Sequence, residues 1–170
     1  MGIVICGFAG IGKTMLQRKY PDKVVDLDSS KYKWLYSALD DGEVGYERKK
    51  IRNQEWPNNY VRDIIQASFE NDIVLTSLDQ EVRDGLRKAH ATYTVCFPTK
   101  ECKEEYIRRY TERGNDTGYI ENISSHFDEW VDSLSKEDET IVMEPGEYLE
   151  DILIRCDFIK RKVDGVVPQQ

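Results

Sequence analysis

Long apolar runs are missing from this sequence of 170 residues. No run approaches the roughly 20 residues that a membrane-spanning helix needs. The short apolar segment at residues 3–6 has neither the length nor the basic flank of a signal peptide. We therefore expect a cytoplasmic protein with no membrane partner.

Patterns typical of disulfide frameworks and zinc sites are also missing. The chain has 4 cysteines and 2 histidines, and no two cysteines have the Cys-x-x-Cys spacing. Small secreted domains and zinc sites depend on such pairs. We therefore expect four reduced cysteines and neither a disulfide nor a zinc ion.

An excess of basic residues is the third missing feature. Lysine and arginine together number 24 against 32 aspartates and glutamates, and the formal net charge is −8. Such a balance gives no general attraction to a nucleic acid or an anionic membrane. Nucleic acid is thus not an expected partner, and any phosphate-binding surface must be local.

What the sequence does contain is an alternation of short apolar runs and segments that can form helices. The runs lie at residues 3–6, 24–27, 73–78, 93–97 and 141–143. Their β-branched residues favour strands, and the alternation predicts an α/β fold whose mostly parallel sheet has helices on both faces. We expect one domain over residues 1–160 and a tail over residues 161–170.

Two apolar stripes at helical spacing are interpreted as core-facing helix surfaces. The first comprises Tyr60, Val61, Ile64, Ile65 and Phe69 behind Pro57, and the second comprises Tyr119, Ile120, Ile123, Phe127, Trp130, Val131 and Leu134. Residues 40–55 are charged and lack periodicity. They predict a mobile insertion or a loosely helical flap.

Residues 7–14 are the most informative segment, because they fit the pattern Gly-x-x-x-x-Gly-Lys-[Ser/Thr] fully. The predicted strand before them and a predicted helix at about residues 13–19 are the context that this loop requires. Its backbone N–H groups can surround a β-phosphate, Lys13 can reach the β- and γ-phosphates, and Thr14 can ligate Mg²⁺. The motif assigns ATP binding to Gly7, Phe8, Ala9, Gly10, Ile11, Gly12, Lys13 and Thr14.

Two carboxylates follow the second predicted strand, in the segment Val-Val-Asp-Leu-Asp that ends at Asp28. Ligands gather at the carboxyl ends of parallel strands, so Asp26 and Asp28 are expected beside the loop and on one face of the strand. We assign Asp28 to the acceptor, as a possible proton acceptor, and Asp26 to magnesium. The alternative is an ordinary polar strand end and helix cap.

Arg109 and Arg113 lie four residues apart, at the end of a predicted helix that runs into a loop ending at Gly118. Phosphoryl transfer spreads negative charge over the transferred group, and guanidinium groups on a closing lid can neutralise it. We predict such a lid at about residues 109–118. The alternative is a solvated basic helix face.

The motifs of a regulatory GTPase are missing, since the chain contains neither Asp-x-x-Gly nor Asn-Lys-x-Asp. The chain resembles instead the small P-loop kinases of the nucleoside monophosphate kinase and shikimate kinase group, and among them the bacteriophage type of (deoxy)nucleotide kinase. The resemblance extends from residue 3 to about residue 159, but only the loop motif is specific. The weaker matches are Asp26-x-Asp28, Arg109-x-x-x-Arg113-Gly114 and Gly146-Glu147-Tyr148.

This resemblance implies a five-stranded parallel sheet of order 2-3-1-4-5 and the use of ATP and Mg²⁺. It also implies an acceptor-side insertion at about residues 40–56. By the same resemblance Pro145, Gly146 and Tyr148 would lie near the adenine base and Arg109 near the triphosphate.

The acceptor is less well defined, because two family signatures are missing. Neither the Asp-Gly-Phe-Pro-Arg segment of adenylate kinases nor the Gly-Gly-Gly segment of shikimate kinases is present. Arg83 is either a ligand of an acceptor phosphate or a helix-surface charge, and Asp79 is an imperfect Walker B-like alternative for magnesium. Aromatic rings and arginines that suit a nucleotide acceptor are Tyr32, Trp34, Tyr36, Arg48, Arg52 and Trp56.

The sequence therefore predicts a kinase that transfers the γ-phosphoryl group of ATP to a (deoxy)nucleoside monophosphate or a nucleoside. Two alternatives stay open: a polynucleotide 5′-hydroxyl kinase, and an ATP-binding sensor or ATPase module that transfers nothing. The sequence leaves a monomer and a homodimer equally open.

Overall fold

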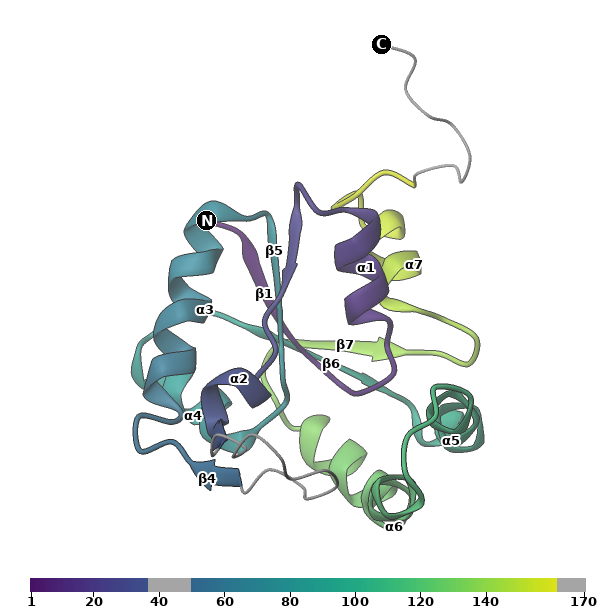
Figure 1. The fold of residues 1–170 in the computed structure, drawn as a ribbon. Coiled ribbons are helices and arrows are strands. Elements are labelled where there is room, and N and C mark those ends of the chain that lie inside the picture. The colour runs from purple at the N-terminus through teal and green to yellow at the C-terminus, as the bar shows by residue number, and fades with distance from the viewer. Residues whose placement is uncertain (37–49, 162–170) are drawn as a thin grey trace, which may run out of the picture.

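A five-stranded parallel sheet forms the centre of the computed structural model, which describes residues 1–36 and 50–161 (Figure 1). Its strands along the chain are β1 (Ile3–Gly7), β2 (Val24–Asp26), β5 (Ile73–Thr76), β6 (Thr94–Pro98) and β7 (Thr140–Met143). Neighbouring strands follow the order β2-β5-β1-β6-β7, and every pairing is parallel. In the register of the central strand, Ile5 lies between Leu75 and Thr94.

Two further strands that the sequence did not predict, β3 (Trp34–Tyr36) and β4 (Lys50–Arg52), pair antiparallel in a small separate sheet. Because they take two of the strand numbers, the labelled order differs from the expected 2-3-1-4-5. Counted within the five-stranded sheet alone, β5, β6 and β7 are the third, fourth and fifth strands along the chain. The predicted flap is wrong over Lys50–Arg52, where three residues pair in a strand; residues 37–49 lie outside the described residues.

Helices cover both faces of the sheet, as the alternation of runs predicted. In Figure 1, α3 (Asn58–Glu70) and α4 (Gln80–Lys88) lie on one side, and α1 (Lys13–Lys19) and α7 (Leu149–Arg155) lie on the other. The remaining helices are α2 (Ser30–Lys33), α5 (Lys103–Glu112) and α6 (Thr117–Leu134), with a short 3-10 helix at Lys100–Cys102 before α5.

The core lies between the sheet and these helices. All four residues of β5 are buried, and Ile5 of β1 and Ile64 of α3 are 0% exposed. Each fully buried apolar side chain of this size contributes roughly 1.5–3 kcal/mol. The stripe on α3 was only partly predicted, because Phe69 at its end is 68% exposed.

All four cysteines are free thiols, and three of them are buried in the core: Cys6, Cys96 and Cys102. Burial raises the pKa of the Cys6 thiol to about 11 and that of Cys96 to about 12. These thiols are therefore protonated near neutral pH and serve as small apolar side chains.

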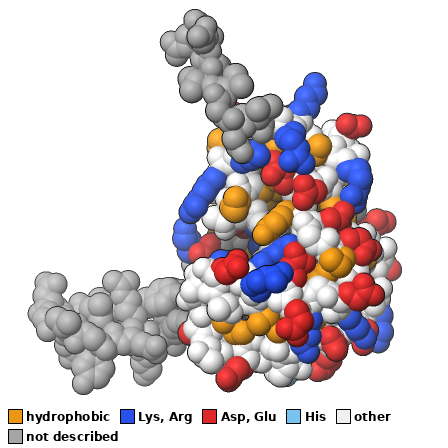
Figure 2. Space-filling model, turned by 90° about the vertical axis from the view of Figure 1, so that its right-hand side faces the viewer, with side chains coloured by type: hydrophobic (Ala, Val, Ile, Leu, Met, Phe, Trp, Pro, Cys, Tyr) orange, Lys and Arg blue, Asp and Glu red, His pale blue; other side chains and the backbone are white. Residues whose placement is uncertain are grey.

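The surface of the described residues is of mixed charge. On the face that Figure 2 shows, their acidic and basic side chains are interspersed, with hydrophobic ones between them. No helix within residues 1–36 and 50–161 combines the length and the apolar character needed to cross a membrane.

Candidate active site

The loop between β1 and α1 makes a tight turn that depends on two of its glycines. Gly10 and Gly12 have φ angles of 91° and 95°, in the left-handed region that side chains disfavour. A Cβ atom on Gly12 would lie 3.1 Å from the Tyr148 ring, and one on Gly10 would lie 3.0 Å from the Tyr110 ring. Both the dihedral angles and the space therefore require glycine at these two positions.

Lys13 is the first residue of α1 and folds back over the loop. Its Nζ donates a hydrogen bond of 2.6 Å to the carbonyl oxygen of Gly7 at the end of β1. Burial lowers the pKa of Lys13, and the Asp26 carboxylate opposes this shift. A cation with incomplete solvation, held beside a glycine loop, is suited to an anionic ligand such as phosphate.

Thr14 and Asp26 are brought together from α1 and β2. Thr14 Oγ1 donates a hydrogen bond of 3.2 Å to Asp26 Oδ2. Burial raises the pKa of Asp26, while Lys13 and the Thr14 hydroxyl lower it. The backbone N–H of Asp26 also donates to Gln17 Oε1 at 2.5 Å, which fixes the strand end against α1.

This oxygen pair fits a magnesium ion. Mg²⁺ takes one or two protein oxygens and completes its shell with water and substrate phosphates. The described residues contain no cluster of three or more His, Cys, Asp or Glu side chains suited to a metal. A magnesium ion at Thr14 and Asp26 would therefore depend on phosphate oxygens for the rest of its shell.

Asp28 does not share a strand face with Asp26, because β2 ends at Asp26. The Asp28 carboxylate is exposed and its Oδ1 accepts hydrogen bonds from Ser30, from the backbone N–H at 3.0 Å and from the hydroxyl at 2.7 Å. Asp28 thus stabilises the first turn of α2. This is the helix-cap alternative that the sequence left open.

Arg109 lies on α5 and is only 8% exposed. Its Nη1 donates to the Gly10 carbonyl at 2.8 Å, and its Nη2 donates to the Glu147 carbonyl at 3.0 Å and to Glu105 at 3.1 Å. The guanidinium also lies 3.9 Å from the ring centroid of Tyr148. Arg109 is therefore close to the loop, as predicted, but it is held by internal contacts rather than free on a lid.

Arg113 differs from Arg109 in being exposed, at the C-terminal end of α5. Burial is the main cause of the lowered pKa of Lys13, and the positive charge of Arg113 adds to it. The loop from Arg113 to the start of α6 is short, since α6 begins at Thr117. The predicted lid at residues 109–118 thus comprises the end of one helix, this loop and the start of the next helix.

The segment after β7 lies against the loop that follows β1. Leu149 N donates to the Ile11 carbonyl at 3.0 Å, and Gly146, with a φ of 82°, donates its N–H to Glu105 Oε2 at 3.0 Å. Pro145, Gly146 and Tyr148 are exposed, so their surfaces are available to a ligand.

Part of the predicted acceptor set comes together, since Arg52 and Trp56 both donate to Glu81 and the Tyr32 and Trp56 rings both contact the Tyr60 ring. Arg52 donates to both carboxylate oxygens of Glu81 at 2.5 Å, and Lys33 Nζ donates to Asp79 at 3.1 Å. Arg83 is 6% exposed and is paired with Glu137. Arg48 lies outside the described residues.

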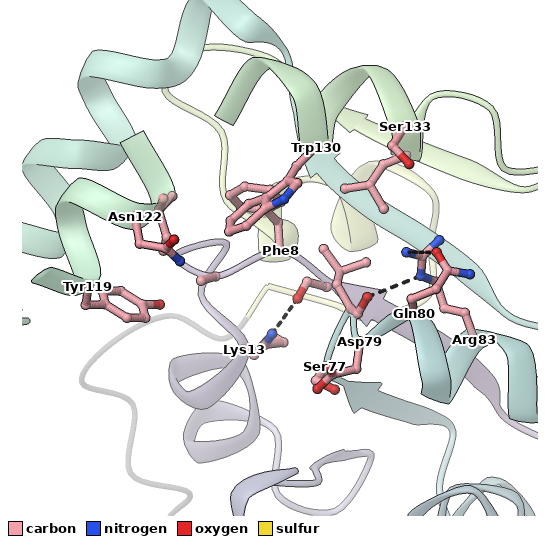
Figure 3. A pocket seen from close by; sticks show the side chains of 15 residues that line it. Phe8, Lys13, Ser77, Asp79, Gln80, Arg83, Tyr119, Asn122, Trp130 and Ser133 are labelled. Atoms are coloured by element: carbon pink, nitrogen blue, oxygen red, sulfur yellow. Dashed lines mark hydrogen bonds between the residues drawn. The ribbon is translucent and has the colours of Figure 1, made fainter. Parts of the chain in front are cut away.

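A cavity of about 570 Å³ opens beside the loop, at the carboxyl ends of β1 and β5 (Figure 3). Lys13, Asp79 and Trp130 line it from three different elements. Its other described lining residues are Gly7, Phe8, Ala9, Ser77, Leu78, Gln80, Arg83, Tyr119, Asn122, Ile123, Ser133 and Leu134. This volume lies within the range of small-molecule sites.

The contribution of α6 to the cavity was not predicted. Ile123 and Phe127 are buried in the core as expected, but Tyr119 and Trp130 are partly exposed and line the cavity. Asn122 also lines the cavity, but it is an exposed polar residue outside the apolar stripe, and nothing in the sequence distinguished it from the solvated face of the helix.

Comparisons with known proteins add no family assignment to this geometry. No protein-family model and no curated protein matches the chain.

Proposed function

We propose that this protein is a phosphotransferase of the P-loop kinase class, which moves the γ-phosphoryl group of ATP to a small acceptor in the presence of Mg²⁺. The acceptor class is a nucleoside or a (deoxy)nucleoside monophosphate. One observation carries the proposal: Lys13, within the glycine loop, lines a cavity of about 570 Å³ at the carboxyl ends of two parallel strands. This is where ligands gather in open α/β sheets.

Each group of the site has a role in this proposal. The backbone of residues 7–14 surrounds the β-phosphate, and Lys13 moves from the Gly7 carbonyl to the β- and γ-phosphate oxygens. Thr14 and Asp26 would hold magnesium, which neutralises charge on the phosphates when it is bound. Catalysis then rests on positioning and on electrostatic stabilisation of the transferred group.

The base of ATP is assigned to the exposed segment after β7. The Tyr148 ring lies beside Gly12 and is 43% exposed, so one edge of the phosphate loop adjoins an available aromatic surface. Pro145 and Gly146 extend this surface. Arg109 holds both segments in place by donating hydrogen bonds to the Gly10 and Glu147 carbonyls.

A small acceptor suits the surface better than a polynucleotide does. A nucleic-acid strand is bound along a basic groove, whereas the described acidic and basic side chains are interspersed on the face in Figure 2. The cavity beside Lys13 has the volume of a small-molecule site.

The test is to incubate the protein with labelled ATP and Mg²⁺ and with nucleosides, nucleotides and short oligonucleotides, and to look for a labelled product. Lys13→Ala should lower transfer by at least roughly a hundredfold, because the lysine stabilises charge that develops in the transition state. Lys23→Ala, an exposed lysine before β2, is the control. Wild-type turnover in Lys13→Ala would contradict the proposal, and ATP binding without any labelled product would favour a sensor.

A further inference from the structure

We infer that the cavity beside Lys13 takes an uncharged acceptor with a flat ring and a hydroxyl group, such as a nucleoside, and that Asp79 accepts the proton of this hydroxyl. This inference rests on the proposed function, because it names the acceptor of the same site. It assigns the acceptor-side carboxylate to Asp79 rather than to Asp28.

The first argument for an uncharged acceptor comes from the charged residues that line the cavity. Among the described residues that line it, the basic ones are Lys13 and Arg83 and the acidic one is Asp79. Lys13 serves the phosphates of ATP in the proposed function. A second phosphate, on the acceptor, would therefore have only Arg83 as a cationic partner there.

Arg83 is already occupied inside the protein. Its Nη1 is paired with Glu137, its Nη2 donates to Gln80 Oε1 at 2.9 Å, and its Nε donates to the Leu78 carbonyl at 3.2 Å. Its side chain is 7% exposed and that of Glu137 is 11% exposed. Breaking a buried ion pair leaves an uncompensated charge, so Arg83 is a poor ligand for an acceptor phosphate.

The α6 wall of the cavity suits a flat ring. Trp130 stacks on His126 with ring centroids 5.4 Å apart, and the Tyr119 ring contacts Tyr110 edge to face at 5.8 Å. These contacts fix the two cavity-lining rings. The amide of Asn122, one residue before Ile123 on the same wall, has no hydrogen-bond partner among the described residues and offers both a donor and an acceptor.

The opposite wall offers partners for a hydroxyl. Ser77 lines this wall, and its backbone N–H donates to Tyr60 Oη at 3.2 Å. Asp79, two residues later, holds Lys33 through Oδ1 at 3.1 Å, while Oδ2 has no partner among the described residues.

The reaction at this wall is a transfer of one phosphoryl group. The acceptor oxygen forms a bond to the γ-phosphorus, and the bond between that phosphorus and the β–γ bridging oxygen breaks. ADP leaves with the electron pair of the broken bond. The hydroxyl proton passes to Asp79 and from there to solvent.

Matched pairs of acceptors test the class of ligand. The full chain, saturated with Mg²⁺ and a non-hydrolysable ATP analogue, is titrated calorimetrically with four nucleosides and with their 5′-monophosphates, and transfer is measured with ATP. We expect at least one nucleoside to bind and to react at least tenfold better than its monophosphate. Tighter binding of the monophosphate in every pair, or no nucleoside binding at all, would overturn the inference.

The two proposals fail in different ways in this experiment. Transfer to monophosphates but not to nucleosides would leave the kinase function standing and overturn the uncharged acceptor. Nucleoside binding without transfer would support the acceptor class and contradict the kinase function.

Two variants with matched controls test the residues. Trp130→Ala should raise the nucleoside Kd about tenfold, the scale of losing an aromatic stacking partner, whereas the exposed Phe69→Ala on α3 should not change it.

Asp79→Asn should lower kcat by roughly a hundredfold, the scale of acid–base catalysis, and by more than Asp28→Asn does. Lys33→Gln removes the same ion pair but keeps the carboxylate, and should retain kcat within a few-fold. Equal losses in Asp79→Asn and Lys33→Gln would overturn the role of Asp79.

Discussion

Arg109 Nη1 donates a hydrogen bond of 2.8 Å to the carbonyl oxygen of Gly10, and this joins α5 to the glycine-rich loop between β1 and α1. The same guanidinium reaches the Glu147 carbonyl, so one buried cation holds two loops that adjoin the proposed ATP site. Its position follows from α5 packing beneath the loop. Arg109 therefore stabilises the shape of the site.

Removing this cation should destabilise the fold. Arg109→Ala removes the donor from the half-buried Gly10 and Glu147 carbonyls and leaves Glu105 with the Gly146 N–H alone, and hydrogen bonds to charged groups contribute about 1.5–3 kcal/mol. We expect the free energy of unfolding to fall by about 3 kcal/mol and ATP affinity to fall with it. Urea unfolding and calorimetry measure both quantities. An Arg109→Ala protein of wild-type stability would show that these contacts contribute little.

Arg113→Ala should lower the rate of transfer and leave the stability of the fold almost unchanged. This side chain is exposed, and surface substitutions usually change stability by less than about 0.5 kcal/mol. The sequence predicts that Arg113 neutralises charge that develops on the transferred group, so its loss should lower kcat roughly tenfold to a thousandfold with ATP affinity almost unchanged. Steady-state kinetics compared with ATP titration give the two values. An unchanged kcat would return Arg113 to the role of a solvated helix-end charge.

Gly12→Ala should weaken ATP binding through the backbone. The residue has a φ of 95°, and its new Cβ would meet the Tyr148 ring at 3.1 Å. Left-handed backbone costs a non-glycine residue about 1–2 kcal/mol, and the contact adds to it. Gly114→Ala is the matched control, because its φ is 77° but no atom lies within 4 Å of a Cβ there. Equal ATP affinity in the two variants would show that the contact with Tyr148 is unimportant.

Glu137→Gln should lower stability in a pH-dependent manner. Burial would raise the pKa of Glu137, but hydrogen bonds from Arg87, Tyr93 and Arg83 outweigh it and lower this pKa. A lowered pKa stabilises the folded protein above the unfolded value, near pH 4.3, and this stabilisation is lost as pH falls through the lower folded value. At pH 7 the variant should be less stable by about 3–5 kcal/mol, the scale of a broken buried pair.

The difference between wild type and Glu137→Gln should shrink below about pH 4. Thermal unfolding measured from pH 7 down to pH 3 tests this trend. Glu139→Gln, which changes an exposed carboxylate two residues away, should follow the wild type at every pH. A constant difference across the pH range would assign the effect to packing rather than to charge.

Local patterns were sufficient for the five strands of the main sheet, the glycine-rich loop and the first helix. Residues 13–19 were predicted as a helix, and α1 spans Lys13–Lys19. The glycine spacing in residues 7–14 required a tight turn, and two of its glycines have positive φ angles. Such features depend on residues that are close together in the sequence, so they can be predicted from the sequence alone.

Side-chain partners could not be predicted in the same way. Arg83 and Glu137 are 54 residues apart, and Lys33 and Asp79 are 46 apart. Nothing in the local sequence distinguishes an arginine that binds a phosphate from one that neutralises a buried glutamate. The short strands β3 and β4 were missed for a different reason, because the mostly charged segment Lys50–Arg52 contains no apolar run that would mark it as a strand.

By itself, the sequence determined the α/β class, the five parallel strands and the tight glycine-rich loop after the first strand, since periodicity and glycine spacing are local properties of the backbone. Only the tertiary structure decided which charged groups remain available to a ligand. Packing placed Arg109 beneath the loop, paired Arg83 with Glu137, and turned Trp130 of α6 toward the cavity. These outcomes depend on how distant segments meet, and burial then fixes the partner of each charge, because an unpaired buried charge is unfavourable.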